Sequence, residues 1–498
     1  MKNLFTILFF LGIFSTGFAQ LPVVVVEPDE GVNVGALNAA VEADTSSVIY
    51  ELRRGGIYYM NGRISTNYPL HIRAEAGDGP RPILQPAADE NSESDRIFSI
   101  GGDLTLESLY ITAKDDIGNI VKNVQRAGIE DLRIVLHDCF YDYDAQCPLR
   151  LDASGAKVFI TNCTYRNILN VNGPNNGRVV DTRGNQTDTI WIENTTISHH
   201  GDLIFRTDGA YVKYFHFDHN TVFVAGEGFD LDGILKAKIT NNILYNMNWQ
   251  GMEPLDPSGF LTNDSLGTID EISDADRHFD FSNNNLYYEQ GQIDAINNNG
   301  SRVQAPFLDS SMMLFAANGQ LDTTNLIHEK LAFDNAPPAP LNYIAVYHEN
   351  DGEVDLVDVP NYYADTDLVN PGESGYTFNI NADAISATAS KTGGMLGSPQ
   401  WTNSIPTSFD VDRINSSPVL IYPVPARNNL YMRINTEKTN ELEIRIFNMA
   451  GQVIKSFSYE QGRHAFSLNI SDLENGIYLY RVNAASELLD AGKFAVQK

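Results

Sequence analysis

The chain has 498 residues, of which 43% are hydrophobic, and its 64 acidic against 34 basic side chains give a formal net charge of -30. A chain of this length can bury a large core and is expected to hold two or three domains. The acidic excess disfavours nucleic acid and anionic membranes as partners, because both are negatively charged. It does not exclude an acidic polysaccharide, because a local basic cleft can override the overall sign.

Residues 1–19 have the pattern of a secretory signal peptide. Lys2 is the basic start, residues 4–14 are mostly apolar, and residues 17–19 (Gly-Phe-Ala) form a small-residue cleavage site. The apolar run is too short for a transmembrane helix. We therefore predict that the mature protein begins at Gln20, is exported and is soluble.

A short helix followed by strands is predicted at the start of the mature chain. Residues 35–44 have the pattern of an amphipathic helix, and residues 46–64 alternate as strands do on either side of a Gly-Gly turn. Strand-like segments continue to residue 164. The open end of a stacked β-structure must be covered, so this helix is expected to cap the first coil.

The centre of the chain repeats a run of alternating apolar residues followed by a polar turn. The last apolar residue before each turn serves as a marker, and the markers are Ile160, Ile192, Phe217, Ile239 and Phe281. The steps between them are 32, 25, 22 and 42 residues. Repetition at this period with strand-like alternation predicts a stacked β-solenoid. The two longer steps predict looped-out insertions or one degenerate coil.

The turns that follow the markers are rich in asparagine, at Asn194, Asn220, Asn242 and Asn284. Asparagine tolerates the left-handed backbone conformation, and stacked Asn side chains form hydrogen-bonded ladders. We therefore interpret these residues as structural rather than as a binding site.

The chain has three cysteines, Cys139, Cys147 and Cys163. An odd number in so long a chain is not a disulfide framework, although export permits disulfides. Cys139 and Cys147 could close a small loop, whereas Cys163 lies in a repeat turn and is expected to be a buried free thiol. No Cys/His spacing suggests zinc, and no metal ligand is predicted.

Two later segments interrupt the repeat. Residues 251–277 are rich in Gly, Pro and acids, and a loop of this length is either functional or disordered. Its acids lack the spacing of known calcium loops, so a solvated loop is the favoured interpretation. Residues 307–402 are predicted to be coil extensions and long loops that finish or cover the solenoid.

A second domain is predicted at the C-terminus. Residues 404–417 have the character of a linker, and residues 418–498 alternate throughout as short strands between turns. This spacing predicts a small β-sandwich.

Several motifs of residues 418–498 resemble the sorting domain of the type IX secretion system of Bacteroidetes-type bacteria. The resemblance implies translocation across the outer membrane, usually followed by removal of the domain and by release or surface attachment. We therefore expect the type IX secretion machinery as a partner and a secreted or cell-surface location. The matching motifs are Tyr422–Pro425, Asn429–Leu430, Phe447–Gln452, Leu473–Tyr478 and Lys493–Lys498.

The helix-then-strand opening at residues 36–64 and the repeated coils resemble the right-handed parallel β-helix proteins of the pectin-lyase-like superfamily. The resemblance implies an all-β fold, with a right-handed parallel β-helix and its N-terminal capping helix over residues 20–403, followed by the small sandwich. Within this superfamily the chain resembles exported bacterial β-helix proteins of unassigned function. The motifs that carry this likeness are Val179–Gly184, Glu193–Ile197, Leu203–Arg206 and Gly394–Trp401.

A more distant similarity is to polysaccharide lyases of the chondroitinase-B and alginate-lyase type. In that family a Lys and an Arg on neighbouring coils carry out β-elimination, with calcium held by nearby acids and an Asn. Arg206 matches the family's Arg, and Arg183 falls where the family has its Lys. Arginine is a poor base, because its guanidinium does not lose its proton. The calcium acids would fall near residues 175–178, where this chain has Asn-Asn-Gly-Arg, so calcium is allowed but no cofactor is assured.

Arg183 and Arg206 are 23 residues apart, about one coil, and are the candidate catalytic residues. If both follow the coil register, their guanidiniums are stacked on strands about 4.8 Å apart. A uronate carboxylate or a sulfate could then bridge them, because arginine grips such groups bidentately. The alternative is that Asp181 and Asp208 neutralise both arginines and the cluster is a surface network.

Other side chains in this region are candidate substrate-binding residues. A histidine can act as a general base near neutral pH, but two histidines in a turn such as Ser-His-His-Gly-Asp are more often solvated. Residues 211 and 213 on the next strand are predicted to line the same face as Arg206. The candidate binding residues are Arg178, His199, His200, Tyr211 and Lys213.

Two hypotheses for function remain open at this stage. The first is a secreted or cell-surface β-helix protein, expected to be monomeric, that binds polysaccharide, in particular acidic glycans, without assured catalysis. The alternative is a polysaccharide lyase that cleaves uronate-containing glycans by β-elimination. Asp230 and Asp232 also suggest a paired-carboxylate hydrolase. The chain lacks the aspartate runs of polygalacturonase-type enzymes, so this interpretation is weaker.

Overall fold

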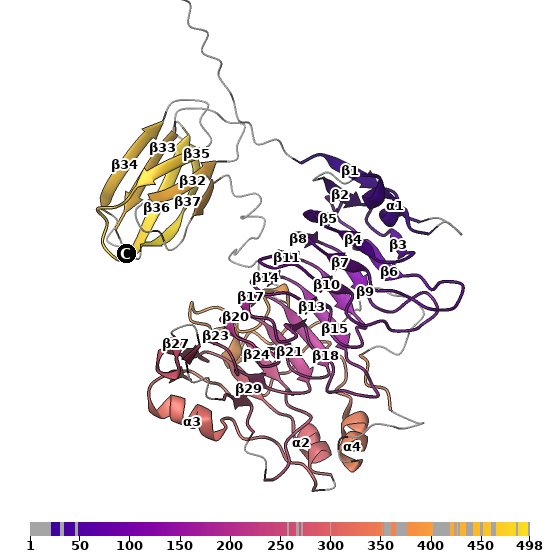
Figure 1. Ribbon diagram of the computed structural model, residues 1–498. Coiled ribbons are helices and arrows are strands. Elements are labelled where there is room, and N and C mark those ends of the chain that lie inside the picture. The colour runs from indigo at the N-terminus through magenta and orange to yellow at the C-terminus, as the bar shows by residue number, and fades with distance from the viewer. Residues whose placement is uncertain are drawn as a thin grey trace, which may run out of the picture. The chain divides into compact units, whose positions relative to one another are not determined.

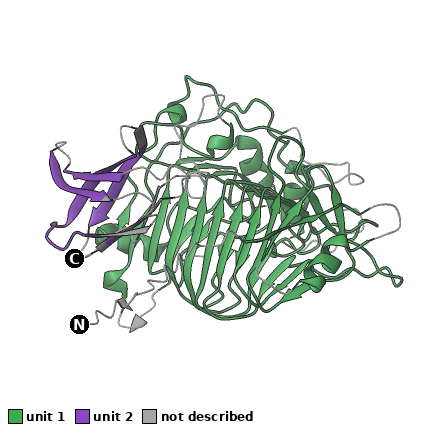
Figure 2. Ribbon diagram, turned by 90° about the horizontal axis from the view of Figure 1, so that it is seen from above, with its two compact units in different colours: residues 1–403 green, residues 404–498 purple. Residues whose placement is uncertain are grey.

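The computed structural model divides into two compact units, residues 1–403 and 404–498 (Figure 2). The predicted signal peptide, residues 1–19, and the whole predicted linker, residues 404–417, lie outside the described residues. The structure describes residues 21–29, 34–44, 48–255, 258–264, 268–269, 272–298, 300–350, 352, 360–364, 376–401 and, with short gaps, 419–496.

Three parallel sheets, here named A, B and C, form the first unit, and the chain visits them in turn, so the unit is a parallel β-helix (Figure 1). This confirms the predicted solenoid. Sheet A contains β1 (Val23–Val26), β2 (Ile49–Leu52), β5 (Leu70–Ala74), β8 (Leu104–Glu107), β11 (Arg133–His137), β14 (Ala156–Thr161), β17 (Thr187–Glu193), β20 (Val212–Asp218), β23 (Lys236–Thr240), β28 (His278–Asp280) and β30 (Leu321–Asp322). Sheet B contains β3 (Ile57–Met60), β6 (Ile83–Pro86), β9 (Tyr110–Thr112), β12 (Phe140–Asp142), β15 (Thr164–Ile168), β18 (Thr196–His200), β21 (Thr221–Ala225), β24 (Ile243–Tyr245) and β29 (Asn285–Tyr287). Sheet C contains β4 (Ile64–Thr66), β7 (Phe98–Ile100), β10 (Gln125–Ala127), β13 (Leu149–Leu151), β16 (Val180–Asp181) and β19 (Phe205–Arg206).

The marker residues of the sequence repeat are in register across sheet A. Ile160 pairs with Ile192, Ile192 with Phe217, and Phe217 with Ile239. All of these side chains are buried in one continuous core that runs along the solenoid. The periodicity is therefore a core periodicity, because each marker occupies the same inward position on its coil.

Three of the four predicted asparagines form the ladder, namely Asn220, Asn242 and Asn284. Asn194 was wrongly included, because the residue whose N–H donates to Asn220 Oδ1 is Thr195. The side chain of Asn220 donates to Oδ1 of Asn242 at 3.2 Å, and the side chain of Asn242 donates to Oδ1 of Asn284 at 3.0 Å. All three side chains are fully buried. The ladder satisfies backbone groups at a tight turn, which supports a structural role.

Helices lie at both ends of the solenoid (Figure 1). At the N-terminal end, α1 (Ala36–Ala43) buries Leu37 and Val41 in the solenoid core, which confirms the predicted capping helix. The other helices among the described residues lie in the later part of this unit's sequence: α2 (Gln290–Ile296), α3 (Ser310–Ala317), α4 (Leu341–Glu349), and the 3-10 turns η1 (Asp274–Asp276), η2 (Ile385–Ala387) and η3 (Pro399–Trp401).

The described parts of segment 251–277 are packed against the solenoid, rather than wholly solvated as predicted. In this segment β25 (Leu261–Thr262) pairs with β22 (Phe229–Asp230), and the short β26 (Thr268–Ile269) pairs antiparallel with β27 (Ile272–Ser273). The fully buried Arg277 donates to the carbonyl oxygens of Leu231 and Ile234. Part of the insertion thus forms an extra coil, and the buried Arg277 guanidinium hydrogen bonds it to the preceding coil.

The end of segment 307–402 covers sheet B, as the sequence predicted. Trp401 Nε1 donates to Thr196 Oγ1 at 2.6 Å, and Ser398 Oγ donates to the carbonyl oxygen of Asn194 at 2.8 Å. Leu396 is fully buried among aromatic side chains of this covering layer. The resembling motif Gly394–Trp401 therefore packs against sheet B.

The three cysteines are free and buried. The alternative of a Cys139–Cys147 disulfide is wrong, because the Cys147 thiol contacts Asn123 Oδ1 at 3.0 Å, whereas the backbone N–H of Cys139 donates to Cys163 Sγ at 3.4 Å. Burial raises the pKa of the Cys139 and Cys147 thiols. The prediction that Cys163 is a buried free thiol is confirmed.

The second unit consists of two antiparallel sheets around a core of its own. This agrees with the predicted small β-sandwich. One sheet has the order β31 (Val419–Tyr422), β32 (Asn429–Ile434) and β35 (Ala465–Asn469), and the other has the order β34 (Val453–Tyr459), β33 (Leu442–Phe447), β36 (Gly476–Ala484) and β37 (Glu487–Val496).

Candidate functional site

Sheet C carries a row of charged and polar side chains on its outer face, one from each strand. The flanking strand residues, such as Phe98 and Leu149, are buried, and side chains alternate along a strand, so the row points away from the core. We call this set the charged row. The parallel register places its members side by side in the order Ser65, Ser99, Arg126, Arg150, Asp181 and Arg206.

Arginines gather in the middle of the charged row. Burial, and then the positive charges of Arg96 and Arg150, lower the pKa of Arg126. Within the described part of the chain, the buried Nε atoms of Arg96 and Arg126 have no hydrogen-bond partner. Arg150 Nε lies 2.6 Å from Asp152 Oδ1. This group, Arg96, Arg126 and Arg150, therefore has excess positive charge and unused donors, which suits an anionic ligand.

Arg183 and Arg206 meet at two aspartates. Arg206 Nη2 donates to Asp181 Oδ2 at 2.9 Å and lies 3.6 Å from Asp208 Oδ2. Arg183 Nη1 lies 4.0 Å from each of the same two oxygens. Both arginines thus lie beside the two aspartates that the alternative interpretation named.

The predicted stacking of Arg183 on Arg206 is wrong. The residue opposite Arg206 in sheet C is Asp181, so the coil step here is 25 residues rather than 23. Arg183 lies beyond the end of β16, in a turn where its φ is 52°. The catalytic role of the two arginines stays a prediction.

A buried carboxyl pair lies beside Arg178. Arg178 Nη2 is 2.6 Å from Asp202 Oδ2, and the side chain of Glu227 hydrogen bonds to Asp202. Burial, and then the neighbouring Asp202, raise the pKa of Glu227 to about 8, and burial raises the pKa of Asp202 to about 6. The raised pKa of Glu227 favours its protonated form at neutral pH.

A second carboxyl group lies on β22, the strand of the next coil. Burial, and then the charge of Asp232, raise the pKa of Asp230 to about 7. Burial also raises the pKa of Asp232, whose Oδ1 accepts a hydrogen bond from the backbone of Asp264. The structure thus brings Asp230 and Asp232 together, and their hydrolytic role stays a prediction. Carboxyls with raised pKa values occur both in acid–base sites and in structural networks.

His199 and His200 lie in strand β18 and are fully buried, so their expected placement in a solvated turn is wrong. His199 Nε2 contacts the carbonyl oxygen of Pro338 at 3.1 Å, and His200 Nδ1 contacts that of Asp202 at 3.3 Å. Burial lowers the pKa of His199 to about 4 and that of His200 to about 3. Both rings are therefore neutral and enclosed by protein, and we leave them out of the proposed site.

Tyr211 and Lys213 do not lie in sheet C. Tyr211 is buried just before β20, and Lys213 is exposed within β20, a strand of sheet A. Lys213 Nζ is 3.8 Å from Asp188 Oδ2. The expectation that these two residues line the face of Arg206 is therefore wrong, because the chain turns from one sheet to the next after Arg206.

The region expected to hold calcium in the lyase family is occupied by an arginine. Arg178 Nη2 donates to the carbonyl oxygen of Asn175 at 2.7 Å, and its Nη1 donates to Asn176 Oδ1 at 3.2 Å. A guanidinium thus takes oxygens that a calcium ion would need. Calcium binding elsewhere stays a prediction.

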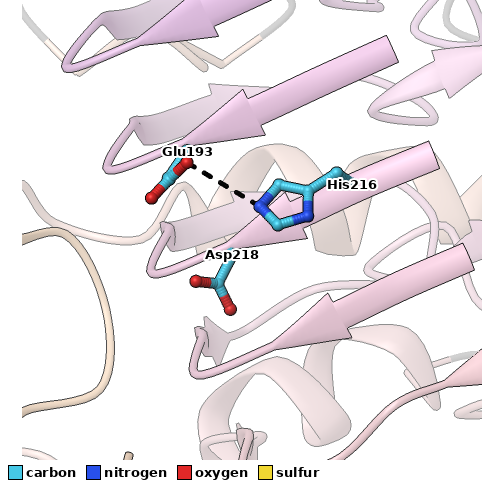
Figure 3. Close-up of side chains that lie close together, drawn as sticks. All are labelled: Glu193, His216 and Asp218. Atoms are coloured by element: carbon cyan, nitrogen blue, oxygen red, sulfur yellow. Dashed lines mark ion pairs between the residues drawn. The ribbon is translucent and has the colours of Figure 1, made fainter. Parts of the chain in front are cut away.

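One group of potential metal ligands was missed by the sequence reasoning. Figure 3 shows Glu193, His216 and Asp218 converging on the outer face of sheet A, and one ligand atom from each lies within 4.8 Å of the others. Glu193 and Asp218 are in register on β17 and β20. Their spacing of 25 residues equals the step between markers Ile192 and Phe217, and this equality is the signal that could have revealed the group.

A separate cavity of about 680 Å³ lies over sheet B. It is lined mainly by Phe223, Tyr245 and residues 330–339 of the covering layer. Lys330 and Glu289 form an ion pair of 3.6 Å among its lining residues. No residue of the charged row lines this cavity, so the cavity is separate from the charged row.

Within the described residues, no helix is long and apolar enough to span a membrane. No curated protein matches the chain.

Residues 420–497 match the family model of the secretion system C-terminal sorting domain. This confirms the resemblance noted for the C-terminal motifs and implies interaction with the type IX secretion machinery. The protein therefore carries a sorting domain for secretion across the outer membrane, to the cell surface or to the outside.

Proposed function

We propose that the parallel β-helix binds acidic polysaccharide along the charged row of sheet C. The observation that carries the proposal is the Arg96, Arg126 and Arg150 group, in which two buried Nε donors have no partner in the described chain. The positive charges of Arg96 and Arg150 act on Arg126, and an anionic ligand would relieve this repulsion. The overall charge of -30 makes a concentrated basic patch unusual on this chain.

The chemistry of arginine defines the ligand class. A guanidinium donates two parallel hydrogen bonds to a carboxylate or a sulfate, which are the anionic groups of uronate-containing and sulfated glycans. Strands lie about 4.8 Å apart, so Arg126 and Arg206 are separated by about 14 Å along the sheet. This row is long enough to contact several consecutive anionic sugars, whereas a single small anion would engage only one end of it.

The experiment compares binding of the purified mature chain to immobilised alginate, pectate, chondroitin sulfate and neutral dextran. Arg126→Ala is expected to weaken binding to the acidic glycans by roughly 10- to 150-fold, because one charged hydrogen-bonding group is worth about 1.5–3 kcal/mol. Arg133→Ala, which removes an exposed arginine from sheet A, is the matched control. Binding is also expected to fall with added salt. Equal binding to dextran and the acidic glycans, or equal loss in both variants, would refute the proposal.

A second candidate function is cleavage of the bound glycan, and the carboxyls beside the arginines favour it. Burial raises the pKa of Glu227 to about 8 and that of Asp230 to about 7, which favours the protonated form that a proton donor to a leaving oxygen needs. Arg206 would neutralise the uronate carboxylate in a β-elimination. Incubating the protein with each uronan and following absorbance of the unsaturated product tests this candidate. The lyase requires product formation that Arg206→Ala abolishes.

A further inference from the structure

We propose that Glu193, His216 and Asp218 on sheet A form a binding site for a divalent transition-metal ion, with zinc as the probe. This site is separate from the charged row and does not depend on glycan binding. Imidazole nitrogens and carboxylate oxygens both bind zinc, and three protein ligands leave a fourth position for water or a further ligand.

The first argument is a buried ring nitrogen without a partner. The His216 side chain is 4% exposed, and its Nε2 has no hydrogen-bond partner among the described residues. Nε2 points toward Glu193, with 3.8 Å between Nε2 and Oε2 (Figure 3). Two ligands on one tetrahedral zinc ion lie about 3.4 Å apart, so a small movement would let one ion bridge them. A buried polar atom without a partner is costly, and a metal ion would satisfy it.

The second argument is that other groups hold each ligand in place. Nδ1 of His216 lies 3.3 Å from the hydroxyl oxygen of Tyr214, which leaves Nε2 as the coordinating atom. Trp191 Nε1 donates to Glu193 Oε2 at 2.7 Å, and its ring stacks on His216 with the centroids 3.5 Å apart. Metal-binding histidines and carboxylates are characteristically oriented by hydrogen bonds of this kind.

Asp218 completes the site from the same strand as His216. Its Oδ2 contacts His219 Nδ1 at 2.8 Å, and its Oδ1 accepts hydrogen bonds from Thr240 and from Asn241. Each carboxylate oxygen has two lone pairs, so Oδ2 retains one for a metal. Lys238 Nζ lies 3.8 Å from Oδ1 and competes with a bound cation. This competition gives the proposal a distinctive test.

The test is a zinc titration of the purified full exported chain by calorimetry. One zinc ion per chain is expected. His216→Gln and Glu193→Gln should each weaken zinc binding at least tenfold, and Lys238→Met should tighten it. His278→Gln, which changes an exposed histidine on β28 of the same sheet, should have no effect.

Fluorescence supplies an independent measurement. Because Trp191 stacks on His216, Cu²⁺ at the site should quench part of the tryptophan emission, and His216→Gln should abolish this component. Circular dichroism verifies that each variant is folded. The absence of a saturable site on the wild-type chain, unchanged zinc affinity in His216→Gln, or no tightening in Lys238→Met would overturn the proposal. If the two ligand variants do not fold, the wild-type stoichiometry and Lys238→Met decide the question.

Discussion

Replacing Asn242 by alanine would remove the central member of the asparagine ladder. Its Nδ2 donates to the carbonyl oxygen of Phe217 at 2.9 Å and to Asn284 Oδ1 at 3.0 Å. Its Oδ1 accepts from the backbone N–H of Asn220 at 2.7 Å and from the Asn220 side chain at 3.2 Å. The side chain is fully buried, so solvent does not substitute for these four contacts in the native structure.

The expected loss of stability follows from the groups left without a partner. Alanine would leave the buried Asn220 N–H without its partner and would remove one donor each from the Phe217 carbonyl and from Asn284 Oδ1. An unsatisfied buried group costs about 1–3 kcal/mol and a lost hydrogen bond about 0.5–1.5 kcal/mol, so we expect a decrease of about 2–5 kcal/mol in the free energy of unfolding. The left-handed residue of this turn is the preceding Asn241, with a φ of 59°, so the substitution at Asn242 adds no such backbone strain.

Guanidinium denaturation of the mature chain, followed by far-ultraviolet circular dichroism, measures the difference. Asn172→Ala, at an exposed asparagine in the insertion before Arg178, is the control and should change stability by less than about 0.5 kcal/mol. A loss below about 1 kcal/mol in Asn242→Ala would refute the reasoning that the ladder carries this stability.

Three further predictions concern titration, thiols and export. The folded chain keeps the Glu227 proton between its ordinary pKa of 4.5 and about 8, whereas the unfolded chain releases it. Raising the pH through this window should therefore lower the stability of the wild type, and Glu227→Gln should reduce that dependence in melting curves. Thiol reagents should react slowly with the native protein and titrate three cysteines after denaturation, because all three are buried and free. Deleting residues 418–498 should abolish export, so that the truncated chain is found in cell fractions instead of the medium or on the surface.

Each of these predictions has a result that would contradict it. Identical pH profiles for wild type and Glu227→Gln would mean that this carboxyl does not titrate as described. Fewer than three thiols after denaturation under non-reducing conditions would indicate a disulfide. Normal export of the truncated chain would show that the matched domain is not the sorting signal in this protein.

The charged row shows where reading the sequence succeeded and where it did not. Arg206 was identified, and the two aspartates beside it were named in the alternative interpretation. Arg126 and Arg150 were missed, because single arginines in short strands carry no local signal. Their importance comes from parallel register, which places residues distant in sequence side by side.

The misplacement of Arg183 has a specific physical cause. The number of residues between two positions can be counted in the sequence. Which residue lies opposite another on the next strand depends on where that strand begins after its turn. The coil between β16 and β19 is 25 residues long rather than 23, so the residue opposite Arg206 is Asp181 and not Arg183. The same effect misplaced Lys213, because the number of residues between Arg206 and the next strand decides which sheet a side chain joins.

The sequence by itself determined the solenoid, its capping helix, the asparagine ladder and the sorting motifs, because each of these depends on local alternation or on contiguous residues. Only the tertiary structure decided the burial of His199 and His200, the carboxyl pair at Glu227 and the convergence of Glu193 with His216. Burial and charge at those positions come from coils and covering segments that are far away in sequence. In a solenoid, the inward apolar residues of each coil can be recognised from the sequence of that coil alone. The side chains that meet on an outer face depend on the register between successive coils.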